Sequence, residues 1–337
     1  HQDKLMHQVG CSISIKKILV NDTTKERLVA VEKGMLTDNP EDILSNPEID
    51  VVIEVMGGIE ETRGYLIEAI KNKKHIVTAN KDLMALHGPE LLELATDNQC
   101  DLFYEASVAG GIPILRGLVD GLSSDRITKM MGIVNGTTNF ILTKMSKEGR
   151  AYDDVLKEAQ ELGFAEADPT ADVGGLDAAR KMAILSTLGF SMNIGLNDVE
   201  VQGITEISEE DLRYSKKLGY TMKLIGVASR AGDRVDVSVQ PALLPEAHPL
   251  ASVNNEYNAV YVYGEAVGET MFYGPGAGSL PTATAVVSDM VTVIKNMRLG
   301  VNGRSAVAPQ YPKQLKDATE IFAKFFIRLH VQDEVGV

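Results

Sequence analysis

The stretch with the most chemical potential runs over residues 159–181, AQELGFAEADPTADVGGLDAARK. Asp177 and Lys181 stand four residues apart in its last part, so on a helix they project from one face and can pair. Asp172 lies just before that helix, and Glu166 lies in the preceding loop. The stretch therefore sets one cation that can act as an acid among several acceptors, and it predicts a site for a small polar ligand.

An Asp–Lys pair at this spacing is also common on solvated helix faces, where it contributes only about 0.2–0.5 kcal/mol. The residues that follow the pair, MAILSTL at 182–188, are almost all apolar. We therefore expect the helix to be buried beyond Lys181, with the charged pair at the edge of a core. This setting favours a functional pair over a solvated one.

A strand–helix alternation in the first third of the chain is expected to position part of the site. Residues 1–10 are typical of the end of a helix. Apolar runs predict strands at 12–20, 50–55, 75–78 and 100–106, and helical periodicity predicts helices near 41–44, at 59–72 and at 83–98. We expect strand 50–55 to be buried on both faces. The pattern predicts the α/β class, with a Rossmann-like, doubly wound parallel sheet.

Sheets of this kind bind ligands beyond the carboxyl ends of their strands, so loops 56–58, 78–81 and 106–111 are expected to face a ligand. The first strand and the G-x-G-x-x-G turn that open such folds are missing from the sequence. A later glycine loop, GPGAG, precedes a long apolar helix. Ser279 or Leu280 fits the start of that helix, with Pro281 at its first position.

The pattern changes after residue 120. A strand over 127–134, an Asn-Gly-Thr turn and a helix follow one another, and a helix at about 152–162 ends at Gly163, which fits a left-handed cap. Strand-like runs between residues 218 and 273 predict a largely antiparallel sheet, with one face exposed or paired between subunits. We therefore expect a second, α+β domain for catalysis and dimerisation.

Two runs resemble homoserine dehydrogenase. The positions that carry the first resemblance are Ala159, Gly163, Phe164, Asp168, Pro169, Asp172, Gly174, Asp177 and Lys181. The second run is GIVNGTTNFIL at 132–142. Because the first run fixes many positions over one long stretch, it is far more specific than a short motif. The resemblance implies the reversible reduction of L-aspartate 4-semialdehyde to L-homoserine with NADPH or NADH.

The resemblance also implies roles for individual residues. Lys181 is expected to donate the proton, directly or through a water, with Lys81 as a second cation and Asp177 as the partner of Lys181. The implied substrate-binding residues are Glu166, Asp172, Asn135, Gly136 and Thr137. The implied cofactor-binding residues are Met56, Gly57, Gly58, Ala79, Asn80, Lys81, Gly163 and Gly278. A monovalent, sodium-like cation is expected on the carboxylate of Glu105 and the carbonyls of Val108, Gly110 and Ile112, because such oxygen ligands suit a hard ion rather than zinc.

Length and composition bound the remaining expectations. The chain has 337 residues, which predicts two domains. The expected ranges are 1–108 with 280–300 for dinucleotide binding, 109–279 for catalysis and dimerisation, and 301–337 for a linker and the start of a truncated regulatory domain of ACT-like type. The resemblance places the missing first strand just before residue 1.

A net charge of −14 argues against a nucleic-acid partner, and the absence of a long apolar run argues against a membrane partner or a signal peptide. Two cysteines are too few for a disulfide framework, so we expect reduced thiols in the cytoplasm. The six histidines form no cluster along the sequence. A small-molecule substrate and a homodimer or higher homo-oligomer are expected.

Three questions stay open at this point. Lys16, Lys17 or Lys25 could meet the 2′-phosphate of NADP, whereas Asp22 could meet a ribose hydroxyl of NAD. Another two-domain NAD(P)-dependent reductase of similar architecture would fit the same pattern. A cofactor- or amino-acid-binding protein without catalysis would also fit, because the sequence lacks the glycine turn.

Overall fold

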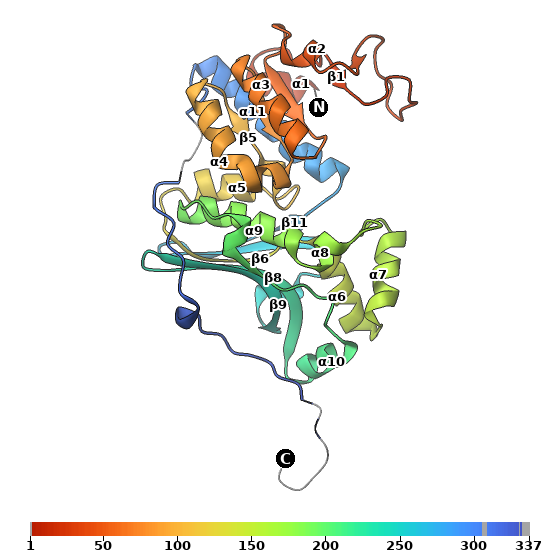
Figure 1. Ribbon diagram of the computed structural model, residues 1–337, viewed down its shortest axis with the longest axis vertical. Helices are drawn as coiled ribbons and strands as arrows, with labels where there is room; N and C mark the ends of the chain where they lie inside the picture. The colour runs from red at the N-terminus through yellow and green to blue at the C-terminus, as the bar shows by residue number, and fades with distance from the viewer. Residues whose placement is uncertain (1, 305–308, 330, 332–337) are drawn as a thin grey trace. The chain divides into compact units, whose positions relative to one another are not determined.

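The computed structural model describes residues 2–304, 309–329 and 331 of the chain, and it divides into two compact units (Figure 1). Unit 1 comprises His1–Ser123, Thr187–Gly195 and Ala277–Tyr311. Unit 2 comprises Ser124–Ser186, Leu196–Gly276 and Pro312–Val337. The domain ranges given above stay a prediction. No helix in the described part of the chain has both the length and the apolar character that crossing a membrane requires.

Unit 1 is built on a parallel sheet of three strands in the order β3-β4-β5. These strands are β3 (Val51–Glu54), β4 (His75–Thr78) and β5 (Leu102–Phe103). A separate parallel pair consists of β1 (Ile18–Leu19) and β2 (Leu36–Thr37). The helices are α1 (Gln2–Val9), α2 (Glu41–Leu44), α3 (Glu60–Lys71), α4 (Lys81–Asp97), α5 (Ile114–Arg116) and α11 (Ser279–Leu299). Helices α3 and α4 join the successive strands of the three-stranded sheet, as the predicted α/β class requires.

Strand β4 lies in the middle of this sheet and all of its residues are buried, which explains the short apolar run HIVT. Helix α11 returns from the far end of the chain and packs Val286 and Val293 against Val77 of β4. Helix α4 begins directly after β4, where the side chain of Asn80 accepts the backbone N–H of Leu83 at 3.0 Å as its N-cap. Packing against α11 and the N-cap bond of α4 therefore hold the carboxyl end of β4 in place.

Several details of unit 1 differ from the sequence predictions. Strand β3 is not buried on both faces, since Ile53 is 41% exposed and β3 is an edge strand of this sheet. The strand expected at 12–20 is limited to β1, and the one at 100–106 is limited to β5 because Glu105–Ser107 forms a 3-10 turn. Pro281 is the third residue of α11, because Gly278 caps the helix with φ 111°.

Unit 2 is built on a six-stranded sheet in the order β11-β10-β6-β8-β9-β7. Its strands are β6 (Ile127–Ile133), β7 (Val199–Val201), β8 (Tyr220–Ala231), β9 (Arg234–Pro245), β10 (Tyr257–Gly264) and β11 (Gly268–Pro275). The helices are α6 (Gly136–Glu148), α7 (Tyr152–Glu161), α8 (Thr170–Val173), α9 (Leu176–Phe190) and α10 (Glu209–Lys217). All pairs except β7–β9 are antiparallel, as predicted for the second domain.

Helix α9 lies unusually close to this sheet. Gly132 on β6 and Gly226 on β8 are register partners, and a Cβ atom built on Gly226 would lie 2.3 Å from Cγ of Met182 on α9. The missing side chains thus make room for the helix. The alternate residues Met131 and Ile133 point to the other face and join a separate apolar cluster. This close packing fixes α9, and with it Lys181, against the end of β6.

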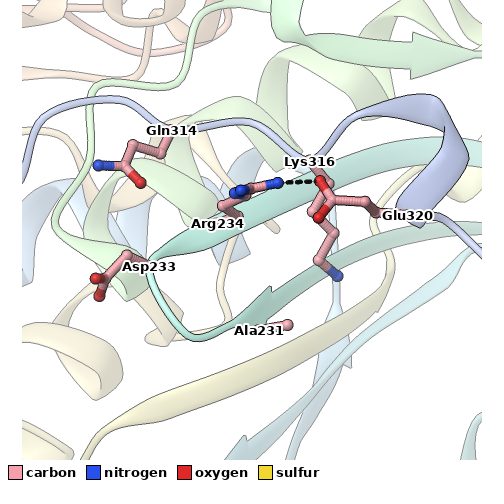
Figure 2. A pocket seen from close by; sticks show the side chains of 6 residues that line it. All are labelled: Ala231, Asp233, Arg234, Gln314, Lys316 and Glu320. Atoms are coloured by element: carbon pink, nitrogen blue, oxygen red, sulfur yellow. Dashed lines mark hydrogen bonds and ion pairs between the residues drawn. The ribbon is translucent and has the colours of Figure 1, made fainter.

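The C-terminal segment of unit 2 runs in extended form beside β9 (Figure 1). The N–H of Val235 donates to the carbonyl of Gln314 at 2.9 Å, and the N–H of Lys316 donates to the carbonyl of Val235 at 2.8 Å. A hollow of about 490 Å³ lies beside this contact, and Figure 2 shows the ion pair between Arg234 and Glu320, two of the residues that line it. Its lining residues are Ala231, Asp233, Arg234, Gln314, Lys316 and Glu320, and it contains none of the predicted site residues.

The start of a regulatory domain expected within 301–337 implies a first strand from residue 327, but Ile327–Leu329 form no strand. Residues 330 and 332–337 of that expected strand lie outside the described residues.

Candidate active site

Lys181 and Asp177 form the ion pair that their spacing on α9 predicts. The Lys181 Nζ atom donates to Oδ2 of Asp177 at 2.7 Å and to the carbonyl of Val134, at the end of β6, at 2.8 Å. The two side chains are only 13% and 7% exposed, respectively. Within the described residues, the third ammonium hydrogen has no acceptor. The lysine is therefore held in one orientation with one donor hydrogen left for a ligand.

Asn135 connects the two aspartates of the site. Its Nδ2 atom donates to Oδ1 of Asp172 at 2.7 Å and to Oδ2 of Asp177 at 2.9 Å. Its Oδ1 atom accepts the backbone N–H of Thr138 at 2.8 Å as the N-cap of α6. Because a backbone N–H can only donate, the capping bond fixes which end of the amide faces the carboxylates. One side chain thus starts α6 and holds Asp172 and Asp177 together.

The turn at the start of α6 is tied to two other segments. The hydroxyl of Thr137 donates to the carbonyl of Phe164 at 2.6 Å and lies 3.4 Å from Oδ2 of Asp172. A Cβ atom built on Gly136 would lie 2.8 Å from the carbonyl oxygen of Glu256, so no side chain fits at this position. The structure thus brings together five predicted residues of unit 2: Asn135, Thr137, Asp172, Asp177 and Lys181.

Glu166 and Gly163 lie outside this network. The side chain of Glu166 is exposed, and no partner for its carboxylate occurs in the part of the chain that the structure describes. Its carbonyl accepts Nε2 of Gln160 at 3.1 Å. Gly163 follows α7 with φ 78°, which confirms the predicted left-handed cap.

A buried lysine that sequence reasoning missed binds Asn139, in the first turn of α6 after the Asn135–Thr137 turn. Lys223 on β8 donates to Oδ1 of Asn139 at 2.9 Å and to the carbonyl of Val253. Asn139 in turn donates to the carbonyl of Asn255 at 2.8 Å. Burial lowers the pKa of Lys223 to about 7, and the positive charge of Lys147 adds to the shift. The only sequence signal was a lysine inside the apolar strand YTMKLIGV.

The predicted cofactor residues of unit 1 follow two neighbouring parallel strands. Met56–Gly58 come after β3, and Ala79–Lys81 come after β4. Gly57 and Gly58 have φ values of 77° and 76°, a backbone conformation that residues with a side chain rarely adopt. Nδ2 of Asn80 donates to the carbonyl of Gly58 at 2.7 Å, so the two loops are joined. The structure thus brings these six residues to one edge of the sheet, while Gly163 belongs to unit 2.

The third loop of unit 1 contacts the start of α11. A Cβ atom built on Gly111 would lie 2.9 Å from Cβ of Pro281, so glycine is needed for this approach. Gly278, another predicted cofactor residue, is the N-cap of the same helix. Loop 106–111 and the start of α11 are therefore packed against each other within unit 1.

Glu105 lies in a charged cluster that the sequence did not reveal. Its two carboxylate oxygens accept the backbone N–H groups of Leu115 and Arg116, both at 2.9 Å. Asp289 accepts the N–H of Glu105 at 2.9 Å and the guanidinium of Arg116 at 2.7 Å. Burial raises the pKa of Glu105 to about 7, with a further contribution from Asp289, whose own pKa burial also raises. One guanidinium thus faces two buried carboxylates.

This excess of negative charge fits a monovalent cation. The carbonyls of Val108 and Gly110 accept no hydrogen bond from any described residue, whereas the carbonyl of Ile112 accepts the N–H of Ile114 at 2.8 Å. Ala109 and Gly110 have φ values of 56° and 53°, so the chain turns sharply there. Across the described residues, no group of three or more His, Cys, Asp and Glu could hold a metal ion. The donor set therefore suits a hard ion held mainly by carbonyls.

Comparison with known proteins was made at the level of sequence and of structure. A family model described as "Homoserine dehydrogenase" matches residues 113–291, and one described as "Homoserine dehydrogenase, NAD binding domain" matches residues 2–105. The homoserine dehydrogenase of Bacillus subtilis (strain 168) is 68% identical over 336 residues, which cover 100% of this chain and 78% of that protein.

Solved structures give the same result. The homoserine dehydrogenase of Thiobacillus denitrificans superposes with a TM-score of 0.87 at 44% identity, over 94% of this chain and 73% of that one. A hyperthermophilic archaeal homoserine dehydrogenase in complex with NADPH superposes with a TM-score of 0.65 at 30% identity, over 76% of this chain and 74% of that one.

Proposed function

The chain belongs to the homoserine dehydrogenase family, and we propose that Lys181 is the proton donor of its reaction. The protein is an NAD(P)-dependent oxidoreductase that interconverts L-aspartate 4-semialdehyde and L-homoserine. The observation that carries the proposal is the fixed ammonium group of Lys181. Asp177 and the carbonyl of Val134 accept hydrogen bonds from two of its three hydrogens, and the third is left for a ligand.

The direction of proton transfer follows from the chemistry. The bound nicotinamide supplies the hydride in the reduction of the aldehyde and accepts it in the reverse direction. Reduction places negative charge on the aldehyde oxygen, which must then be protonated. Lys181 gives its free hydrogen to that oxygen, so an N–H bond breaks and an O–H bond forms. Asp177 holds the amine in place throughout, and solvent returns the proton to Nζ afterwards.

The remaining unit 2 residues hold the amino acid. Asp172 and Glu166 carry the negative charge that an α-ammonium group requires, and Glu166 has an exposed carboxylate in the loop that precedes α8. The backbone N–H groups of Gly136 and Thr137 stand at the start of α6, where a substrate carboxylate is favoured. Asn135 keeps Asp172 and Asp177 together and so maintains the shape of the pocket.

The cofactor is assigned to the loops of unit 1. Met56, Gly57, Gly58, Ala79 and Asn80 line the carboxyl ends of two parallel strands, where dinucleotides bind in such sheets. Lys81 and Gly278 extend this surface, and Lys81 is assigned as the second cation. Gly163 completes the set by resemblance. The archaeal relative in complex with NADPH supports NADPH as one cofactor, with NADH as the alternative.

We assign the cation, the assembly and the compartment on separate grounds. Sodium or a similar ion is proposed on Glu105 and the carbonyls of Val108, Gly110 and Ile112, where it would balance buried negative charge. A homodimer is proposed through the unit 2 sheet, because β11 is an edge strand with exposed side chains. A cytoplasmic location is proposed because both cysteines are unpaired.

One assay tests the assignment as a whole. Purified full-length protein is supplied with L-homoserine and either NADP or NAD, and the formation of reduced nicotinamide is followed by absorbance. We expect turnover with homoserine, increased by sodium over an equal concentration of a large organic cation. A protein that reduces sugars or dipicolinate-pathway substrates instead, with no turnover of homoserine, would contradict the proposal.

A further inference from the structure

Glu54 is a charged residue at the end of an apolar strand, and its side chain is only 5% exposed. Its Oε1 atom accepts the backbone N–H groups of Met56 and Gly57 at 2.8 Å and 2.9 Å. Its Oε2 atom accepts the hydroxyl of Thr78, at the end of the neighbouring strand β4. One carboxylate therefore links the ends of two parallel strands.

The hydrogen bonds continue from Thr78 and return to the first loop. Oγ1 of Thr78 accepts the N–H of Asn80 at 3.0 Å, and Nδ2 of Asn80 donates to the carbonyl of Gly58 at 2.7 Å. Glu54, Thr78, Asn80 and the Met56–Gly58 turn thus form a closed ring of hydrogen bonds. In such a ring each bond holds the next group in its orientation, so the removal of one member loosens both loops.

The ring decides which groups the Met56–Gly58 turn can offer to a ligand. The N–H groups of Met56 and Gly57 are used by Glu54, and the carbonyl of Gly57 is used by the hydroxyl of Thr62. Of the turn's three backbone N–H groups, only that of Gly58 has no acceptor among the described residues, and Met56 is 52% exposed beside the two glycines. With a single N–H left, this surface suits the flat face of a ring better than a phosphate, whose oxygens need several N–H donors.

We propose that Glu54 is a positioning residue for the nicotinamide cofactor: it locks the loops after β3 and β4 into one surface that receives a ring face of the dinucleotide. The inference rests on the proposed placement of the cofactor on these two loops. Glu54 itself does not touch the cofactor. Both oxygens of its carboxylate already accept hydrogen bonds, from the backbone N–H groups of Met56 and Gly57 and from the hydroxyl of Thr78.

Asp101 provides a matched control within the same sheet. It is also a buried carboxylate, and it accepts the N–H of Gly303 at 2.8 Å and the amides of Asn296 and Asn302 at 2.8 Å and 2.7 Å. It directly precedes β5, so it lies at the amino edge of the parallel sheet, opposite the edge that Glu54 occupies. Loss of Asp101 should lower stability by a comparable mechanism without changing the cofactor surface.

The test compares Glu54→Ala and Thr78→Val with Thr78→Ser and Asp101→Ala in the full-length enzyme. We expect the Kd and KM for NADPH to rise about tenfold or more in Glu54→Ala and Thr78→Val, as the loss of a charge-assisted hydrogen bond implies. The kcat and the KM for homoserine should change much less. Thr78→Ser keeps the hydroxyl and should restore cofactor binding, while Asp101→Ala should lower the Tm alone. Should Glu54→Ala fail to fold, the two Thr78 variants carry the comparison.

Met56→Glu separates this inference from the placement on which it rests. A carboxylate in place of the exposed thioether should weaken NADPH binding if the turn faces the cofactor. If Met56→Glu weakens binding but Glu54→Ala and Thr78→Val lower only the Tm, the role of Glu54 is refuted and the placement stands. If all these variants bind NADPH as the wild type does, the placement of the cofactor on these loops is refuted, and the role of Glu54 is refuted with it.

Discussion

Lys181 and Asp177 form a buried ion pair in which Nζ lies 2.7 Å from Oδ2. The same unit contains another lysine–carboxylate pair with the same four-residue spacing, Lys144 and Glu148 on α6, at 2.9 Å. The side chains of that pair are 26% and 42% exposed, against 13% and 7% for Lys181 and Asp177. Exposed pairs contribute little, whereas loss of one partner of a buried pair leaves an uncompensated charge. Lys144 therefore serves as the control for Lys181.

Asn135 has two functions that substitution can separate. Serine also caps helices well but is too short to reach both aspartates, so Asn135→Ser should keep the stability of α6 and lose the bridge. We expect its kcat to fall about tenfold or more, since the pair then loses one charge-assisted hydrogen bond. Asn135→Ala should lose the same activity and also about 1 kcal/mol of stability. Calorimetry and steady-state kinetics on both variants measure the two effects; equal activity in Asn135→Ser and wild type would show that the bridge is dispensable.

Glu166 is expected to act on substrate binding alone. Its carboxylate is exposed and lies outside the Asn135 network, so Glu166→Gln should leave Lys181 in place. The KM for aspartate semialdehyde should rise about tenfold, as expected for one lost charged contact, with an unchanged KM for the cofactor. Glu161→Gln, an exposed change at the end of α7, is the control. An unaltered semialdehyde KM in Glu166→Gln would remove this residue from the substrate site.

Lys223 should make the stability of the protein depend on pH. Its folded-state pKa of about 7 lies below the value of 10.5 expected for an unfolded chain, so between these values the unfolded state binds more protons. The free energy of unfolding should therefore rise with pH in this window, with a slope of up to about 1.4 kcal/mol per pH unit. Denaturant unfolding at several pH values measures the slope. It should disappear in Lys223→Met and persist in Lys216→Met; a slope unchanged by Lys223→Met would assign it to other groups.

Gly136 has no room for a side chain. A Cβ atom there would lie 2.8 Å from the carbonyl oxygen of Glu256. The residues on either side, Asn255 and Tyr257, are held in place because their carbonyls accept Nδ2 of Asn139. Gly136→Ala should therefore shift the Asn135–Thr137 turn, lower the Tm and raise the KM for homoserine. Overpacking of this kind costs about 1–3 kcal/mol. Gly64→Ala on α3, where nothing lies within 4 Å, should leave both quantities unchanged or raise the Tm slightly. Crystal structures or Tm values that show no difference between the two variants would contradict the steric argument.

Sequence patterns correctly predicted the features that depend on residues close together in the chain. The Asp177–Lys181 pair, the left-handed Gly163, the Gly57–Gly58 turn and the helix over 176–190 all depend on neighbours a few residues away. The antiparallel sheet of unit 2 was likewise predicted, because its alternation and turns are local signals. Family resemblance added the role of each residue, which spacing alone does not supply.

Long-range contacts could not be predicted in this way. Asn135 meets Asp172 and Asp177 across 37 and 42 residues, and Arg116 meets Asp289 across 173 residues. Glu54 was overlooked because a single charge in an apolar strand carries no local indication of its partners. The predicted burial of β3 was wrong for a related reason: whether a strand lies at the edge of a sheet depends on which strands pair with it, and not on its own sequence.

The most direct test of Lys181 as proton donor is the kcat of Lys181→Met for aspartate semialdehyde reduction, measured together with the Kd for NADPH. Methionine keeps the length of the side chain but has no proton to give, so kcat should fall about a hundredfold to ten-thousandfold while the Kd stays close to that of the wild type. Lys144→Met, which removes the more exposed lysine of the second pair with this spacing, should change neither quantity. A Lys181→Met enzyme with a kcat near that of the wild type would contradict the assignment.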